Sequence, residues 1–223
     1  MNSNVTGLVW SILFIIIILA FVAVLKKTTK INDEILRKIV HIGVSNWWLI
    51  NLHFKLDMEV VIIAPLVFMF LNAFAIMVPK VGEIFGFVGK KRNYGLIYYP
   101  FSISVLLYLC YSGYLPFYAG TIGVLCMGYG DGFAAITGTL WGNKKISLKT
   151  GGKTYLGSFV MAVVCNLVCV FTFALSTSFG TLQIIIASLI ISIVSALVEM
   201  LTPLGLDNVS VPLIAAVLAG VIL

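Results

Sequence analysis

The feature that most constrains this chain is its series of long apolar runs. Residues 8–25, 60–78 and 182–201 form three such runs, and each has about the 20 residues that a helix needs to cross the hydrocarbon core of a bilayer. Only 10% of the residues are charged and the mean hydropathy is +1.13, whereas soluble domains carry about 25% charged residues. The sequence therefore predicts an all-α, polytopic integral membrane bundle.

Eight apolar segments are candidate spans: 8–25, 39–52, 60–78, 95–111, 115–141, 156–175, 182–201 and 209–223. Two of them, 39–52 and 209–223, are short, so we expect seven to eight transmembrane helices. The helix of 39–52 is expected to extend inward as an amphipathic helix from near Asn32. Segment 8–25 lacks the basic region and small-residue cleavage site of a signal peptide, which favours a retained first span. We expect one transmembrane catalytic domain over 1–223.

Basic residues are confined to a few loops. Of the 14 lysines and arginines, all but Lys55 lie in three clusters, at 26–38, 80–92 and 144–153. Lysine- and arginine-rich loops face the cytoplasm in membrane proteins. This pattern predicts that both termini lie on the side of the membrane away from the cytoplasm. We expect the protein in a cell inner membrane or an endomembrane. It also explains the net charge of +6 without a nucleic-acid partner.

With this orientation, the ionisable residues at membrane depth collect near the cytoplasmic face. His41 lies at the inner end of segment 39–52, Asp131 in the inner half of segment 115–141, and Glu199 at the inner end of segment 182–201. Asp207 and Asn208 follow in the last inner loop. Ionisable groups within a membrane are energetically costly, so they indicate a functional site. We therefore expect the working chemistry at the cytoplasmic face.

Segment 115–141 combines a carboxylate with a row of small residues. Asp131, Ala134, Gly138 and Gly142 are spaced by three, four and four, which puts them on one face of a helix. Close packing of membrane helices also uses small residues at this spacing. That alternative does not account for a carboxylate in the same row, whereas a Mg²⁺-phosphate ligand fits carboxylate oxygens beside exposed backbone.

The next polar segment, Gly151-Gly152-Lys153-Thr154, precedes a span and resembles a phosphate-binding loop. Backbone N–H groups at a helix N-terminus, together with a lysine, attract anions. The spacing of a P-loop fails, because Ser147 stands where that motif requires glycine. The alternative is a lysine-rich cytoplasmic loop without a specific ligand, and this describes Lys144 and Lys145 better than Lys153.

Toward the N-terminus, five polar residues fall within one helical stripe that leads into the second span: Glu34, Arg37, Lys38, His41 and Ser45. His41 has a side chain suited to act as general base toward a hydroxyl group, and the alternative is a structural histidine paired with a carboxylate. The four cysteines, in contrast, lie inside apolar runs without a C-x-x-C pair. We expect them to be small packing residues.

Together these motifs resemble the polyprenol kinase family, which comprises phytol kinases, dolichol kinases and CTP-dependent diacylglycerol kinases. The resemblance runs from about residue 34 to the C-terminus. Its matching pieces are Arg37-Lys38-x-x-His41, Gly130-Asp131-x-x-Ala134-x-x-x-Gly138-x-x-x-Gly142, Lys153-Thr154-x-x-Gly157-Ser158, and Glu199 followed by Asp207-Asn208-x-x-x-Pro212.

The resemblance implies transfer of a phosphoryl group from CTP to the hydroxyl of a membrane lipid, either an isoprenoid alcohol or diacylglycerol. It implies that Asp131 binds Mg²⁺, with Glu199 or Asp207 as further metal ligands or as a base. The triphosphate would be bound by the following residues: Arg37, Lys38, Gly138, Gly142, Lys153, Thr154, Gly157, Ser158 and Asn208. His41, with Arg37, would act on the hydroxyl or a phosphate.

Two other functions compete with a kinase. A CTP:phosphatidate cytidylyltransferase shares a D-x-x-A-x-x-x-G-x-x-x-G stretch and a following K-[ST]-x-x-G segment, but the Asp207-Asn208-x-x-x-Pro212 ending is more similar to the kinases. A transporter or non-catalytic membrane subunit would spread its polar residues through the depth of the membrane. Here they are expected at one boundary, which favours an enzyme.

Overall fold

The computed structural model describes residues 3–78, 94–146 and 152–222, and these are helical with short connections. The helices run in the order α1 (Ser3–Thr28), α2 (Asp33–Ser45), α3 (Trp47–Phe54), α4 (Met58–Val61), α5 (Ile63–Met77), α7 (Gly95–Tyr111), α8 (Phe117–Leu125), the π-helix η1 (Cys126–Asp131), α9 (Gly132–Trp141), α10 (Tyr155–Ser176), α11 (Thr181–Leu201) and α12 (Asp207–Val221). Within these residues there is no β-strand, which confirms the all-α class. The basic residues of 80–92 lie outside the described residues.

Four helical segments in the described parts of the chain are long and apolar enough to cross a bilayer: α1, the continuous 117–141 segment, α10 and α11. Residues 58–74, α7 and α12 are shorter apolar helices. The count of seven to eight spans therefore stays a prediction. Two expected spans are broken, the first between α2 and α3 at Asn46 and the second between α4 and α5 at Ile62. Asn32 caps the N-terminus of α2 by accepting a hydrogen bond from the Glu34 backbone N–H, close to the expected start.

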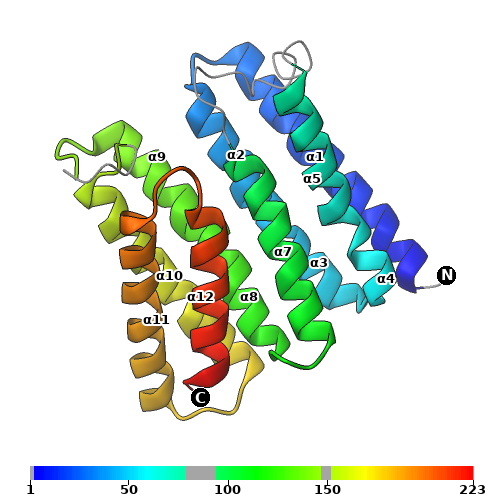
Figure 1. Cartoon of the computed structure of the whole chain (residues 1–223), viewed down its shortest axis with the longest axis vertical. Coiled ribbons are helices and arrows are strands. Elements are labelled where there is room, and N and C mark those ends of the chain that lie inside the picture. The colour runs from blue at the N-terminus through cyan, green and yellow to red at the C-terminus, as the bar shows by residue number, and fades with distance from the viewer. Residues whose placement is uncertain (1–2, 79–93, 147–151, 223) are drawn as a thin grey trace.

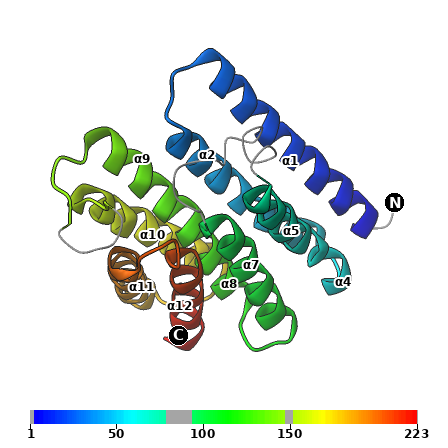
Figure 2. The ribbon, with the colours of Figure 1, turned by 45° about the horizontal axis from the view of Figure 1, so that its top comes forward.

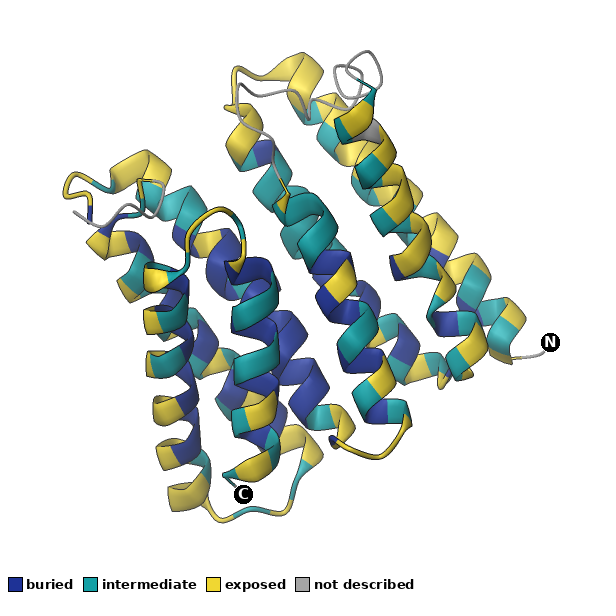
Figure 3. Ribbon diagram, viewed as in Figure 1, coloured by how far each residue is buried: buried dark blue, intermediate teal, exposed yellow. Residues whose placement is uncertain are grey.

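The helices pack side by side in alternating directions (Figures 1 and 2). The 117–141 segment lies at the centre and packs against α2, α10 and α12. Peripheral helices such as α1 and α11 turn apolar side chains outward (Figure 3), as expected for surfaces that contact lipid. The ends of α1, α9 and α11 and the starts of α2, α10 and α12 lie at one end of the bundle, and α1 begins and α12 ends toward the other (Figure 1).

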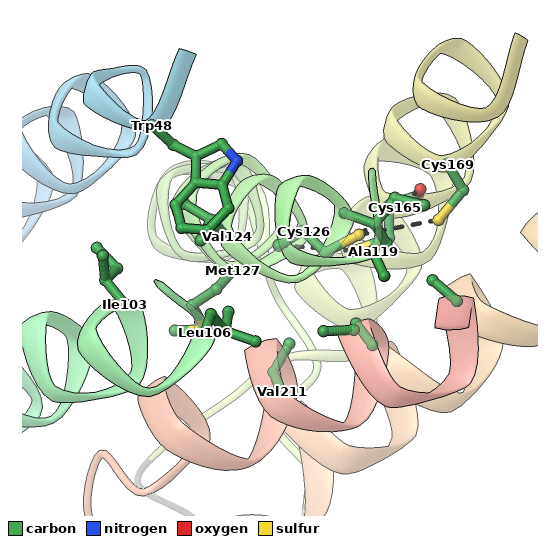
Figure 4. Packing of buried hydrophobic residues seen from close by; sticks show 14 of the residues in the cluster. Trp48, Ile103, Leu106, Ala119, Val124, Cys126, Met127, Cys165, Cys169 and Val211 are labelled. Atoms are coloured by element: carbon green, nitrogen blue, oxygen red, sulfur yellow. Dashed lines mark hydrogen bonds between the residues drawn. The ribbon is translucent and has the colours of Figure 1, made fainter. Parts of the chain in front are cut away.

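The core around α8 and η1 is closely packed and contains all four cysteines. Figure 4 labels Cys126, Cys165 and Cys169 among the residues of this core. The Cys126 Sγ lies 4.0 Å from the Cys169 Sγ and 3.9 Å from the Cys165 backbone oxygen. All four cysteines are buried and free. They serve as small packing residues, as the sequence predicts.

The π-helical turn at Cys126–Asp131 directly precedes α9. It contains Gly128 and Gly130, and Gly132 follows it. A Cβ atom at Gly132 would lie within 2.8 Å of the Ile42 side chain, and one at Gly128 would overlap the Ser45 side chain. These glycines therefore allow α2 to approach η1 closely. Single π-turns are rare within α-helices and are frequent at functional sites, and this one ends on Asp131.

Candidate active site

Asp131 is the last residue of η1 and is almost fully buried, with 4% of its surface exposed. Its Oδ2 forms an ion pair with the Lys38 ammonium on α2. One turn further along α2, the His41 Nε2 lies 3.8 Å from the same oxygen. The close approach of α2 to η1 thus brings together the carboxylate and the basic stripe that the sequence singled out.

A second ion-pair group joins three elements. The Lys153 Nζ lies 3.0 Å from the Glu199 Oε1 at the end of α11 and 2.9 Å from the Asp207 Oδ2 at the start of α12. It also donates to the backbone oxygens of Glu199 and Thr202. Burial alone would lower the pKa of Lys153, but the Asp207 and Glu199 carboxylates outweigh it and hold that pKa above its usual value. Lys153 is therefore a cation at neutral pH.

Lys153 reaches this position because the chain turns sharply before it. Gly152 has a φ of +90°, a conformation that residues with a Cβ rarely adopt. Thr154 then pairs with Lys145 in a short antiparallel bridge. On either side of it, the Ile146 N–H donates to the Lys153 backbone oxygen and the Tyr155 N–H donates to the Lys144 backbone oxygen. Residues 147–151, which contain Gly151 of the loop, lie outside the described residues.

The two groups meet in one acidic centre. Asp131, Glu199 and Asp207 are all buried, and each offers an oxygen atom within 4.8 Å of the oxygens offered by the other two. Three converging carboxylate oxygens fit a divalent cation such as Mg²⁺, which prefers oxygen ligands. Lys38 and Lys153 provide the positive charges that compensate these carboxylates.

The row of small residues on α9 faces the start of α10. A Cβ atom at Gly138 would lie 2.8 Å from the Thr154 Oγ1, and one at Gly142 would lie 2.7 Å from the same atom. A Cβ atom at Gly157 would lie 2.9 Å from the Ala134 backbone oxygen. The glycines thus allow close helix packing, the alternative considered above. Gly142 is the C-cap of α9 and lies outside the helix, yet it faces the same Thr154 side chain as Gly138.

The remaining predicted residues surround this centre. Thr154 is the N-cap of α10 and its Oγ1 accepts a hydrogen bond from the Gly157 N–H. The Ser158 Oγ lies 3.4 Å from the Glu199 Oε2. The Asn208 Nδ2 donates to the Asp207 Oδ1 at 3.0 Å. Arg37 lies farther out, where it pairs with Glu34 at 3.8 Å.

A single cavity of about 990 Å³ is lined by all of these residues. It contains the carboxylates, the two lysines, Arg37 and His41 at one end. It then extends between α1, α2, α5 and α7, where its lining is mainly aliphatic and aromatic and includes the polar side chain of Asn72. Charged groups and a hydrophobic wall therefore share one space, which suits a ligand that has a polar head and an apolar tail.

Tyr99 on α7 is a site residue that sequence reasoning missed. It is buried, and its ring lies 3.9 Å, centre to centre, from the His41 imidazole. Its hydroxyl donates to the Val124 backbone oxygen at 3.2 Å, next to the π-turn. A tyrosine beside Pro100 within an apolar helix was the available signal, but it is a weak one because tyrosine is common in membrane helices.

Together the fold and the site define a helical membrane protein whose buried carboxylates and lysines open onto an apolar cavity. The sequence is 31% identical over 191 residues to a protein named phytol kinase from Synechocystis sp. (strain ATCC 27184 / PCC 6803 / Kazusa), and the match covers 83% of this chain and 78% of that protein. This chain belongs to the polyprenol kinase family. No family model matches the chain, and no solved structure matches it.

Proposed function

We propose that this chain is a lipid-alcohol kinase that transfers the γ-phosphoryl group of CTP to the hydroxyl group of an isoprenoid alcohol. The observation that carries the proposal is the single cavity in which the acidic and basic centre opens onto an apolar wall. Membership of the family of phytol kinase supports the reaction class and the acceptor. The choice of CTP as donor follows from the family resemblance.

Asp131, Glu199 and Asp207 would hold Mg²⁺, since their oxygens converge and form ion pairs with Lys38 and Lys153. The bound ion would neutralise charge on the transferring phosphate oxygens. Catalysis of phosphoryl transfer consists largely of positioning and electrostatic stabilisation. Electrostatic stabilisation is stronger in a buried centre, because less water screens the charges.

The nucleotide would lie beside this centre. Lys38, Lys153 and Arg37 line the cavity with positive charge, and charge-assisted hydrogen bonds to phosphate oxygens are among the strongest in proteins. The lining also includes Gly138, Gly142, Gly157 and Ser158, together with Thr154 at the N-terminus of α10 and Asn208 near the start of α12. This wall of small and hydroxyl-bearing residues suits a triphosphate.

His41 would accept the proton of the alcohol. Its Nε2 is buried without a hydrogen-bond partner and faces the acidic centre, and an orphaned buried polar atom is costly unless a ligand satisfies it. The alcohol oxygen forms a bond to the γ-phosphorus while the bond from that phosphorus to the β–γ bridging oxygen breaks. The hydroxyl proton passes to His41, and CDP leaves.

The site would face the cytoplasm, with both termini on the opposite side. Lys26 and Lys27 lie at the end of α1, and Lys144 and Lys145 follow α9. The ends of α1 and α9 lie at the same end of the bundle as the end of α11 and the start of α12 (Figure 1), which carry Glu199 and Asp207. The basic loops of membrane proteins are retained in the cytoplasm, where nucleotides are available.

The experiment that tests the proposal uses purified protein with Mg²⁺, CTP and a panel comprising phytol, shorter prenols, dolichol and diacylglycerol. Mass spectrometry should detect an isoprenyl monophosphate together with CDP. A CDP-linked lipid with pyrophosphate would instead identify a cytidylyltransferase. The absence of any nucleotide-dependent lipid product would contradict an enzymatic function.

A further inference from the structure

The apolar end of the cavity has a defined lining. We call it the apolar arm, and its wall is formed by Ile15, Val44, Trp47, Ala64, Phe68 and Ile103. These residues come from α1, α2, α3, α5 and α7. They lie inside the bundle, in contrast to the many apolar side chains that point outward toward lipid.

The arm begins where the polar centre ends. The rings of His41 and Tyr99, in contact at an interplanar angle of 35°, connect α2 to α7 at the junction. Beyond them, Val44 follows His41 one turn along α2, and Trp47 begins α3 after the break at Asn46. Ile103 follows Tyr99 one turn along α7. The reactive end of a bound chain would thus lie beside the His41 Nε2.

The end of the arm is fixed in place. Trp47 is 4% exposed and its indole N–H donates to the Ser11 Oγ at 3.0 Å. Ile103 is 3% exposed and belongs to the same core. A wall with a hydrogen-bonded tryptophan does not collapse easily, so the arm is a preformed pocket.

Resting on the proposed kinase function, we propose that the apolar arm binds the hydrocarbon tail of the substrate and selects alcohols with a single chain. The whole cavity has a volume of about 990 Å³, which is at the upper end of the range for one drug-sized ligand. It must hold nucleotide phosphates as well as lipid, so one chain fits and the two acyl chains of diacylglycerol do not.

Binding the tail in the arm positions the hydroxyl more than it contributes affinity. Lipid tails are about as apolar as the side chains of the arm, so transfer from the bilayer into the arm gains little hydrophobic energy. A held tail instead fixes the hydroxyl near His41, and such positioning lowers the barrier to reaction. Changes to the arm are therefore expected to affect kcat as well as KM for the alcohol.

Filling the arm tests this inference. Ala64→Phe should reduce kcat/KM for phytol at least tenfold, yet leave kcat/KM for the short soluble alcohol 3-methyl-2-buten-1-ol and KM for CTP within twofold. Ala174→Phe, at an exposed position near the far end of α10, is the matched control and should be neutral. Equal effects of the two variants, or an equal loss with both alcohols in Ala64→Phe, would overturn the assignment.

The wild-type protein provides tests that do not depend on the folding of a variant. A phytol analogue with a photoreactive diazirine in its tail should label α5 and α7 at residues that line the arm, and excess phytol should compete. Labelling confined to the outward faces of α10 and α11 would overturn the inference, as would equal turnover of diacylglycerol and phytol. Failure of the kinase proposal is distinguishable, because no alcohol would then be phosphorylated by the wild-type protein.

Discussion

Replacing Asp131 by asparagine separates the chemical role of this carboxylate from its structural role. The side chains of Asp131 and Lys38 are 6% and 13% exposed, so their ion pair is largely buried. Removing one partner of a buried pair costs about 3–5 kcal/mol, because the other charge is left uncompensated. The amide side chain of the variant would retain a hydrogen-bond acceptor. We therefore expect the free energy of unfolding to fall by an amount near the lower of these values, which would be seen as a reduced melting temperature in detergent.

Catalysis should suffer separately from stability. Loss of a metal-ligating charge is expected to reduce kcat by at least ~100-fold, which corresponds to ~2.7 kcal/mol of transition-state stabilisation. The stabilisation that Mg²⁺ and CTP give to the wild-type protein should also vanish, because it reports ligand binding to the folded state.

A second variant resolves the two effects. In Asp131→Asn/Lys38→Met both charges are absent, and replacing a buried ion pair as a whole is often neutral. The melting temperature should therefore recover toward the wild-type value while activity stays low. A single Asp131→Asn variant that phosphorylates phytol at a near-normal rate would refute the reasoning, since the carboxylate would then be purely structural.

Three further predictions concern other parts of the site. Single cysteines at Asn143 and Lys55, in a background without native cysteines, should react with impermeant thiol reagents from opposite sides of the membrane; reaction from the same side would contradict the proposed orientation. Lys153→Ala should reduce turnover at least tenfold and also lower the melting temperature, because Glu199 and Asp207 lose their shared counter-charge. Replacing Lys144 and Lys145 together by alanine should reduce turnover much less. Equal losses of turnover in the two variants would indicate a diffuse electrostatic effect instead of a specific contact of Lys153. His41→Ala should lower kcat by ~100-fold, within the usual range for a general base, with KM for CTP unchanged; a change confined to that KM would assign the residue to the nucleotide.

The long helices were largely predictable from hydropathy. The segment 95–111 coincides with α7, and segments 156–175 and 182–201 differ from α10 and α11 by one residue at most at each end. The breaks at Asn46 and Ile62 were not predicted, because an apolar run carries no signal for where its helix bends. The π-turn before Asp131 was likewise missed: glycines permit it, but their spacing does not distinguish it from an α-helix.

Within the site, the convergence of His41, Asp131 and Glu199 followed from their common depth in the membrane. The sequence did not predict that Lys153 pairs with Glu199 and Asp207, since such long-range contacts depend on how the helices are arranged. The apolar arm was also not predictable, because residues such as Phe68 and Ile103 have the same character as the many apolar residues that face lipid.

The most direct test of the central claim follows the phosphorus atoms of CTP into the product. Protein in nanodiscs is incubated with phytol and Mg²⁺, once with CTP radiolabelled at the γ-phosphate and once with CTP labelled at the α-phosphate. A kinase transfers only the γ-label to the lipid and retains the α-label in CDP. Appearance of the α-label in the lipid, with the γ-label released in pyrophosphate, would contradict the proposed reaction.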